Sequence, residues 1–463
     1  VLLPTYPFQR SRYWVERAPR NPIPTGEPVW DLAAATAETQ SQQGPLDLQV
    51  STYAGRWDLL DRLTSAYIRT TFSQLGAFAA AEESWTADSL LARLKIQPTY
   101  HSLMQRWLEK LASAGLLRHQ DGAFTNPAPL PAPDLTALRR EAAEKLADTP
   151  MLLEYVAGCG ERLTAVISGA TSPLETLFPG GSSRLAEDLY QNWAGSRYYA
   201  EMVRAAANAA VQNLLAKGQS VRILELGAGT GATTSHVLPV LPTDGRCVYV
   251  FTDISDLFLG RAAEKFAQYP FLQFARLDVE KDPAGQGFAA HSFDLVIATN
   301  VLHAVPSLRQ ALRHALELLS PGGILILNEV TTHLSWYDIT TGLIEGWQSF
   351  KDDLRSTSPL IAAAEWESLL AQSGFGPLVA YPRAGSPAGI LGQHVILAQA
   401  PLDGVDGRSA GAPVGAERTA ILAAPAAPQA NPVEEWLARF QTALPDERKE
   451  MVLDLVRQKL GRV

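Results

Sequence analysis

Cysteine is almost absent from this sequence. The 463 residues contain two, Cys159 and Cys247, which lie far apart and outside any Cys-x-x-Cys spacing. This excludes a disulfide framework, which needs several paired cysteines, and a zinc ribbon, which needs four clustered ligands. No other cluster of ligands predicts a metal site. We expect both cysteines to be small buried residues and the chain to work in a reducing, cytoplasmic setting.

Positive charge is also in short supply. Lysine and arginine together number 39, whereas aspartate and glutamate number 48, so the formal net charge is −9. A mildly acidic surface argues against general binding to nucleic acid or to anionic membranes, because both need basic patches. It is compatible with a cationic ligand.

Long apolar runs are missing as well. No stretch approaches the roughly 18 residues of a membrane-spanning helix. The opening VLLPTYPFQRSRYW lacks the basic segment and apolar core of a signal peptide, and it has no initiating methionine. We therefore expect neither a membrane segment nor a secretion signal, and we interpret the chain as a section of a longer protein.

Changes in composition divide the sequence into five segments. The first is rich in proline and arginine and is typical of an extended strap. A segment with helical periodicity follows, and then one in which short apolar runs alternate with helical stretches. An Ala/Pro/Gly-rich stretch, typical of a flexible linker, separates these from an amphipathic helix pair. The predicted bounds are 1–30, 31–184, 185–400, 401–432 and 433–463.

Part of the helical segment has the pattern of a winged helix. Thr86 is expected to cap the helix TADSLLARL, a second amphipathic helix follows, and Gly115 is expected to end that helix before GLLRHQDGAFT. Winged helices can bind DNA, but this second helix carries few basic residues. We therefore favour a packing module over a DNA-binding regulator.

A glycine-rich motif carries the strongest chemical signal. Runs such as VRILELG, CVYVFTD and FDLVIATN are typical of buried parallel strands. After the first run come Glu225, Gly227, Gly229 and Gly231, in the pattern Glu-x-Gly-x-Gly-x-Gly. Glycines at a strand-to-helix turn let the backbone approach a ligand closely. The spacing differs from the G-x-G-x-x-G of nicotinamide-binding folds and resembles that of S-adenosylmethionine-dependent methyltransferases.

Polar residues at the ends of later runs predict the rest of the cofactor site. Asp253 ends the second run, where an acid can accept both ribose hydroxyls. Asp278 follows the next short run, where such folds place an adenine-contacting acid, and Asn300 follows FDLVIAT. Glu225 suits the ammonium group of the cofactor. Each acid taken singly is equally compatible with a solvated surface charge.

Several linked motifs together resemble one family. ILELGAGTGATTSHVLPVLP, YVFTDIS, HSFDLVIATNVLHAVPSLRQAL and LLSPGGILILNEVT are similar to the C-methyltransferase domain of modular type I polyketide synthases, and the likeness covers about 55–400. LPTYPFQRSRYW is similar to the linker that follows an acyltransferase domain, and LPDERKEMVLDLVRQKLGRV resembles the first helix of an acyl-carrier domain. The resemblance implies an α/β fold: a Rossmann-like class I S-adenosylmethionine-dependent methyltransferase core with a mostly helical N-terminal lid subdomain.

The resemblance also implies a reaction and its residues. The substrate would be a β-ketoacyl chain on the phosphopantetheine arm of an acyl-carrier protein, with the neighbouring acyltransferase and carrier domains as partners. His303 would take a proton from the α-carbon, and Glu329 would orient that histidine. The enolate would then take the methyl group of S-adenosylmethionine. Tyr190 matches a tyrosine of the family's lid, although the QNWAGSRYY after it departs from the family's usual continuation.

The sequence leaves alternatives open. Polyketide O-methyltransferase domains share the core motifs, so an enol or β-hydroxyl oxygen is an alternative acceptor. A structural insert without activity is a second alternative, although the intact glycines and acidic residues argue against it. Trp336, Tyr337 and Trp347 are compatible with an acyl channel or with the hydrophobic core, and we slightly favour the core.

Overall fold

The computed structural model describes residues 28–402. The predicted segments over 1–30, 401–432 and 433–463 lie outside the described residues, except for a few positions at their inner ends. Within residues 28–402, every helix falls short of the length and hydrophobicity that a bilayer crossing requires.

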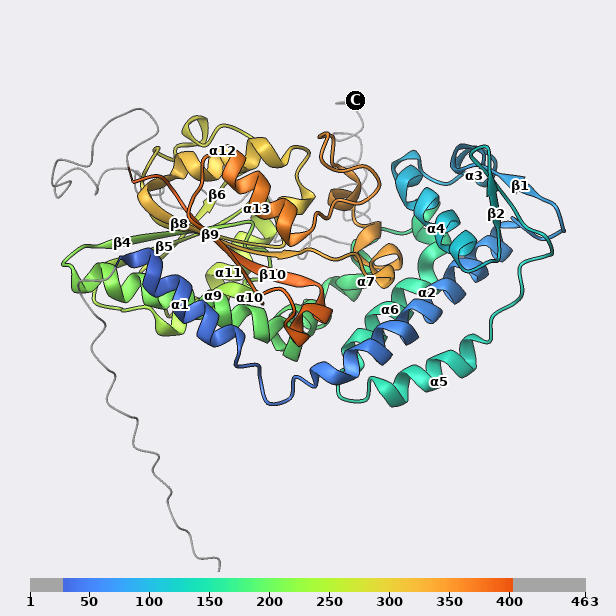
Figure 1. Cartoon of the computed structure of the whole chain (residues 1–463), viewed down its shortest axis with the longest axis horizontal. Helices are drawn as coiled ribbons and strands as arrows, with labels where there is room; N and C mark the ends of the chain where they lie inside the picture. Colours follow the sequence, from blue (N-terminus) through green and yellow to red (C-terminus); the bar gives the residue numbers. More distant parts are fainter. Residues whose placement is uncertain (1–27, 403–463) are drawn as a thin grey trace, which may run out of the picture. The chain divides into compact units, whose positions relative to one another are not determined.

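A seven-stranded sheet lies at the centre of the second half of the described chain (Figure 1). The strand order is β6-β5-β4-β7-β8-β10-β9, and β10 runs in the opposite direction to the other six strands. The strands β5 and β6 lie on one side of β4, and the next strands along the chain, β7 and β8, lie on its other side. This reversal creates the switch point where open α/β sheets bind ligands. This confirms the predicted α/β fold. The strands are β4 (Val221–Leu226), β5 (Cys247–Asp253), β6 (Leu272–Arg276), β7 (Phe293–Thr299), β8 (Leu319–Val330), β9 (Leu378–Tyr381) and β10 (Gln393–Gln399).

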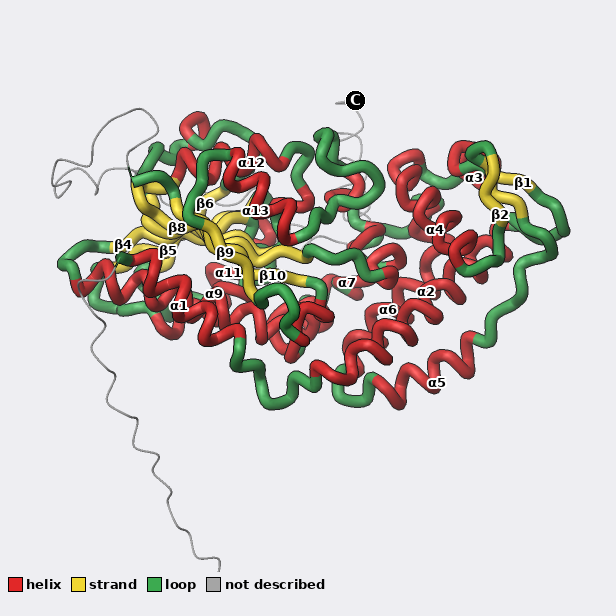
Figure 2. The backbone as a smooth tube through the Cα atoms, viewed as in Figure 1, coloured by secondary structure: helices red, strands yellow, loops and turns green. Residues whose placement is uncertain are grey.

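Helices cover both faces of this sheet. Successive side chains of a strand point to opposite faces, so Ile223 joins one hydrophobic cluster and Leu224 another. Figure 2 shows α1 and α9 on one side of the strands and α12 and α13 on the other. The covering helices are α1 (Val29–Ser41), α9 (Ala194–Ala216), α10 (Ala232–Val237), α11 (Asp256–Lys265), α12 (Leu308–Leu318) and α13 (Ala363–Gln372).

Helix α1 packs with the sheet's own helices. Its buried Trp30, Ala33 and Ala37 share a hydrophobic cluster with Tyr198 and Met202 of α9. The small alanines allow the two helices to approach closely. The contacts therefore place α1 with the α/β layers, whereas the predicted boundary at residue 31 put most of it with the lid.

Residues 53–193, called the lid region below, are mostly helical. A small three-stranded sheet of order β1-β3-β2 lies beside α3 and α4, so this part has the helix and hairpin composition of a winged helix. The elements are α2 (Tyr53–Leu75), β1 (Ser84–Trp85), α3 (Ala87–Leu94), α4 (His101–Ser113), β2 (Arg118–Gln120), β3 (Ala123–Thr125), α5 (Leu135–Lys145), α6 (Pro150–Ile167), α7 (Leu174–Leu177), α8 (Arg184–Glu187) and a π-helix (Asp188–Asn192).

Local sequence signals set several of these boundaries. The Thr86 hydroxyl accepts from the Ser89 N–H, and the Ser89 side chain accepts from the Thr86 N–H, which completes a capping box. Gly115 follows the end of α4 with a φ of 72°, a left-handed conformation that glycine adopts at no steric cost. The predicted cap and helix end are confirmed. Cys159 and Cys247 are free and buried, as expected, and burial raises the pKa of each thiol to about 12.

A buried ion pair joins the lid region to the loop after β8. Arg106 on α4 donates from Nε to Asp338 Oδ1 at 2.8 Å, and both side chains are less than a tenth exposed. His333 Nε2 lies 3.2 Å from the other oxygen of Asp338. Burial opposes ionisation of Asp338, but the His333 hydrogen bond and the charges of His333 and Arg106 outweigh it and lower the pKa of this carboxyl.

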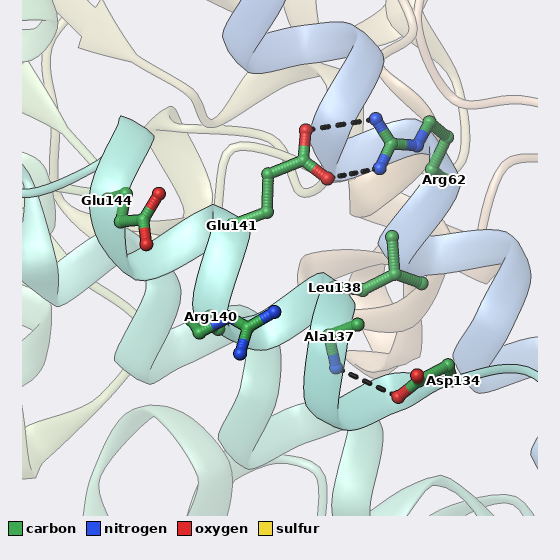
Figure 3. Close-up of a pocket in the computed structure, with 7 residues that line it drawn as sticks. All are labelled: Arg62, Asp134, Ala137, Leu138, Arg140, Glu141 and Glu144. Atoms are coloured by element: carbon green, nitrogen blue, oxygen red, sulfur yellow. Dashed lines mark hydrogen bonds and ion pairs between the residues drawn. The ribbon is translucent and has the colours of Figure 1, made fainter.

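A second ion pair within the lid region is exposed. Arg62 of α2 makes a two-pronged contact with Glu141 of α5 (Figure 3), beside an open hollow on the surface. The Arg62 hydrogen bond, with Lys145 beside it, lowers the pKa of Glu141 to about 2. Solvent screens such pairs, so it is expected to contribute little to stability.

Arg106→Met is therefore expected to destabilise the protein by about 3–5 kcal/mol, because it leaves the buried carboxylate of Asp338 without its main cation. Urea unfolding followed by circular dichroism measures the change. Arg62→Met is the matched control and should leave the midpoint nearly unchanged. Equal, small effects of the two substitutions would contradict the assignment of Arg106 as a structural tie.

Candidate active site

A cavity of about 360 Å³ lies at the carboxyl ends of β4, β7 and β8, between the sheet and the lid region. Its walls come from both parts of the protein. The sheet side includes Glu225, the glycine loop, Asn300, His303, Asn328 and Gln393, and the lid side includes Tyr155, Phe178, Leu189, Tyr190 and Trp193.

The three glycines of the motif form a tight loop after β4. Gly227, Gly229 and Gly231 all have positive φ angles, of 54°, 56° and 71°. A Cβ on Gly227 would come within 2.7 Å of Val301, and one on Gly231 within 2.6 Å of Phe266. A Cβ on Gly229 would meet no side chain within 4 Å, and Gly229 lines the cavity. The backbone at Gly229 therefore borders the cavity with no side chain in between, and its contact with a ligand stays a prediction.

Glu225 is buried at the cavity wall directly before this loop. Thr234 and Tyr249 both donate hydroxyl hydrogen bonds to its Oε2, the latter at 2.7 Å, so Oε1 is left for the cavity. Burial raises the pKa of Glu225 to about 7, in spite of these two hydrogen bonds. A positive charge beside the carboxyl would favour its ionised form.

Asp253 contacts the glycine loop, whereas Asp278 pairs with a lysine after β6. Asp253 ends β5 and accepts from the Gly229 N–H at 2.9 Å, so it braces the glycine loop. Burial raises its pKa, and hydrogen bonds from backbone N–H groups partly offset the rise. Asp278 follows β6, where it contacts Lys281 at 2.8 Å. Neither carboxylate belongs to the wall of the 360 Å³ cavity.

His303 and Glu329 form a buried pair at the end of the sheet. His303 Nδ1 lies 2.6 Å from Glu329 Oε2, and Glu329 Oε1 accepts from the N–H groups of Val301 and Leu302 at 3.0 and 2.8 Å. Glu329 is 0% exposed. Because the carboxylate accepts at Nδ1, it places the imidazole proton there and leaves Nε2 as the basic nitrogen. His303 lines the cavity.

A second buried group holds the His303 loop from the other side. Arg355 donates to the carbonyl oxygens of His303 at 2.9 Å and Val305 at 2.8 Å, and its side chain is 0% exposed. Asp352 binds the same guanidinium at 2.7 Å. Burial opposes ionisation of Asp352, but the hydrogen bonds from Arg355 and from the Leu308 N–H lower its pKa.

Aromatic side chains form the cavity wall next to His303. The centroid of the Trp347 ring lies 5.3 Å from that of the imidazole and 5.5 Å from that of Tyr337. The ring centroids of Tyr337 and Trp336 are 4.3 Å apart. All three line the cavity and also belong to the lid region's hydrophobic cluster, so they are part of the core, as the sequence slightly favours. Their role as an acyl channel stays a prediction. Tyr190, on the π-helix, lines the same cavity, and burial raises its pKa to about 12.

The sequence did not single out Arg355, Asn328 or Gln393. Asn328 stands at the end of an apolar run beside Glu329, which is a signal of the kind that selected Asn300. Asn300 has a φ of 53° and donates from its N–H to the Asn328 carbonyl at 2.8 Å. Arg355 and Gln393 carry no sequence signal, because only the folded chain brings them to the site. Among residues 28–402 no three His, Cys, Asp or Glu side chains are grouped to hold a metal ion.

Arg355→Met is expected to loosen the His303 loop, because it removes buried charge-assisted hydrogen bonds worth about 1.5–3 kcal/mol. Amide hydrogen exchange at residues 301–305 should become roughly 10- to 100-fold faster. Arg309→Met removes an exposed arginine of α12 that pairs with Asp353 at 3.4 Å, and it serves as the control. Unchanged exchange in the Arg355 variant would show that the loop is held by Glu329 alone.

Comparison with known proteins agrees with this geometry. Residues 224–325 match a family model described as a methyltransferase domain. The polyketide synthase ThaG of Burkholderia thailandensis is 36% identical over 345 residues, which are 71% of this chain and 6% of ThaG. The chain thus spans a small fraction of that curated relative.

Two solved structures match this chain over nearly the whole of their own length. The CurJ carbon methyltransferase is 34% identical with a TM-score of 0.76, and the match covers 81% of this chain and 99% of that one. The DszA carbon methyltransferase is 29% identical with a TM-score of 0.71, over 83% and 98% of the two chains. The chain belongs to the carbon-methyltransferase domains of polyketide synthases, for which S-adenosylmethionine is the methyl donor.

Proposed function

We propose that this chain moves a methyl group to the α-carbon of a β-ketoacyl chain that is attached to the phosphopantetheine arm of an acyl-carrier protein. One observation carries the proposal. His303, which is paired with the buried Glu329, lines the same cavity as the glycine loop. A base and a place for a methyl donor therefore share one enclosed space.

His303 acts as the base in this proposal. The carbon between a ketone and a thioester is acidic enough for a side chain to deprotonate it. Glu329 holds the Nδ1 proton at 2.6 Å and stabilises the imidazolium that forms when Nε2 takes a second proton. Arg355 and the two N–H bonds to Glu329 keep the loop in place during the transfer.

The residues present fit the cofactor. When bound, S-adenosylmethionine supplies an electrophilic methyl group on a sulfonium ion. Glu225 would hold the ammonium group through Oε1, and the bare backbone at Gly229 would lie against the ligand. Asp253, at the end of β5, would bind the ribose while it braces Gly229. The adenine role of Asp278 and the cofactor role of Asn300 stay predictions.

Several features support a carrier-bound acyl substrate. The curated relatives are multidomain polyketide synthases, in which this chain corresponds to one section. The cavity wall formed by Tyr190, Trp336, Tyr337 and Trp347 is largely apolar, as an acyl chain requires. Tyr190 would close the cavity from the lid side. The cytoplasmic location stays a prediction.

Methylation of oxygen is the alternative that needs an experiment, because the same base could deprotonate an enol or hydroxyl. The chain would be incubated with labelled S-adenosylmethionine and an acetoacetyl-loaded acyl-carrier protein, and the product examined by NMR. A carbon-bound methyl doublet supports the proposal, and a methoxy singlet supports the alternative. Failure to bind the cofactor in calorimetry would instead support a structural insert.

His303→Ala is expected to lower the methyl-transfer rate by about 100-fold or more, because the general base is lost. Cofactor affinity, measured by calorimetry, should stay within about twofold of the wild-type value. His101→Ala is the control, since His101 is half-exposed and pairs with Asp88 on the surface of the lid region. Wild-type turnover in the His303 variant would remove this residue from the mechanism.

Cofactor affinity is expected to depend on pH through Glu225. Its pKa of about 7 means that the carboxyl is largely protonated in the free protein near pH 6. A bound ammonium ion favours the ionised form, so binding releases a proton and affinity rises with pH up to about 7. In the free protein the same raised pKa costs stability as pH rises from about 4.5 toward 7.

Calorimetry in buffers of different ionisation enthalpy measures this proton release. Glu225→Gln should abolish the release and flatten the pH dependence of affinity, whereas Glu109→Gln, an exposed position on α4, should leave both unchanged. A pH-independent wild-type affinity would show that Glu225 does not contact the ammonium group.

A further inference from the structure

Two amide side chains, one on β8 and one on β10, line the cavity. They belong neither to the His303–Glu329 pair nor to the glycine loop. Gln393, the first residue of β10, donates from Nε2 to Asn328 Oδ1 at 2.6 Å. Asn328 is 3% exposed and lies two residues before the end of β8. Both residues belong to the cavity wall.

The sheet order places this amide pair on the His303 side of the cavity. The glycine loop follows β4 and Asp253 ends β5. On the other side of the switch point, His303 follows β7, and Asn328 and Gln393 belong to β8 and β10. Asn328 directly precedes Glu329, and successive side chains point to opposite faces. Glu329 therefore reaches His303, while Asn328 faces Gln393.

The hydrogen bonds leave part of the pair unused. An amide side chain has two N–H donors and one carbonyl acceptor. The bond between the two amides occupies the Asn328 oxygen, and in residues 28–402 the structure records no acceptor for the Asn328 NH₂ group. Because Asn328 lines the cavity, this NH₂ group is available to donate to an acceptor on the ligand.

We propose that Asn328 donates from Nδ2 to a carbonyl oxygen of the β-ketoacyl substrate, and that Gln393 is a positioning residue that fixes the Asn328 amide. This rests on the function proposed above. When His303 Nε2 takes the α-proton, the C–H electron pair moves onto the ketone and thioester oxygens. A donor already aimed at one of these oxygens stabilises the enolate. It also keeps that oxygen engaged, which favours methylation at carbon.

Deuterium exchange tests this step without the cofactor. The full chain is mixed with acetoacetyl-pantetheine in D₂O, and loss of the α-proton signal is followed by NMR against an enzyme-free blank. Asn328→Asp keeps the shape but replaces the donor with a negative charge. We expect its enzymatic exchange rate to fall about 100-fold. Gln393→Leu should lower the rate about 10-fold with little change in KM, because it frees the Asn328 amide to rotate.

Further measurements separate this role from a structural one. Both variants should bind S-adenosylmethionine within about twofold of wild type, and with cofactor present their products should contain a larger methoxy fraction. Gln310→Leu, an exposed position on α12 that donates to the Glu280 carbonyl, is the matched control.

Each outcome has a defined meaning. Wild-type exchange and product ratios in both variants would overturn the role of Asn328. If Asn328→Asp fails to fold, Gln393→Leu decides, and unchanged exchange in that variant overturns the proposal. If the wild-type chain catalyses neither exchange nor methyl transfer, the function proposed above fails instead.

Discussion

The hydrogen bond between His303 and Glu329 is the interaction on which the site depends. Glu329 is fully buried, and a buried carboxylate is tolerated only when its oxygens are satisfied. Here one oxygen accepts from two backbone N–H groups and the other from the imidazole. The same three bonds that make the charge tolerable also fix the loop after β7 and set the tautomer of His303. The same hydrogen bonds therefore stabilise the buried carboxylate and prepare His303 for its proposed role as a base.

The remaining parts of the site follow from the sheet. Parallel strands bring their carboxyl ends to one edge, so Glu225, Asp253, Asn300 and Glu329 all come from that edge although they are far apart in sequence. The order of the strands separates two chemistries. The glycine loop lies on the β4–β5 side, and His303 and the amide pair lie on the β7–β8–β10 side. The lid region forms the cavity wall opposite the sheet, and the ion pair between Arg106 and Asp338 joins it to the loop after β8.

Prediction from sequence succeeded where a local pattern carries the signal. The strands appeared as short apolar runs, Thr86 and Gly115 marked helix ends, and the motif from Glu225 to Gly231 marked a loop that offers its backbone to the cavity. Prediction was less successful where the contacts join residues that are far apart in the sequence. The boundary at residue 31 cut into α1, because nothing in that helix's own residues indicates that its alanines face α9. Trp336 and Tyr337 were assigned to core or channel as alternatives, and the folded chain places both in a hydrophobic cluster that also borders the cavity.

The sequence by itself determined the fold class and marked the glycine loop, and the family resemblance pointed to His303 and Glu329 as the proposed base and its carboxylate partner. Each of these features lies within a few residues of a recognisable strand end. Only the tertiary structure decided how these groups are tuned. It removed Glu225 from water and so raised its pKa to about 7, and it set Asp253 to brace Gly229. It also brought Arg355 to the His303 carbonyl and Gln393 to Asn328. Those contacts join residues dozens of positions apart, and desolvation is a property of the folded surroundings, so neither is written in any local pattern.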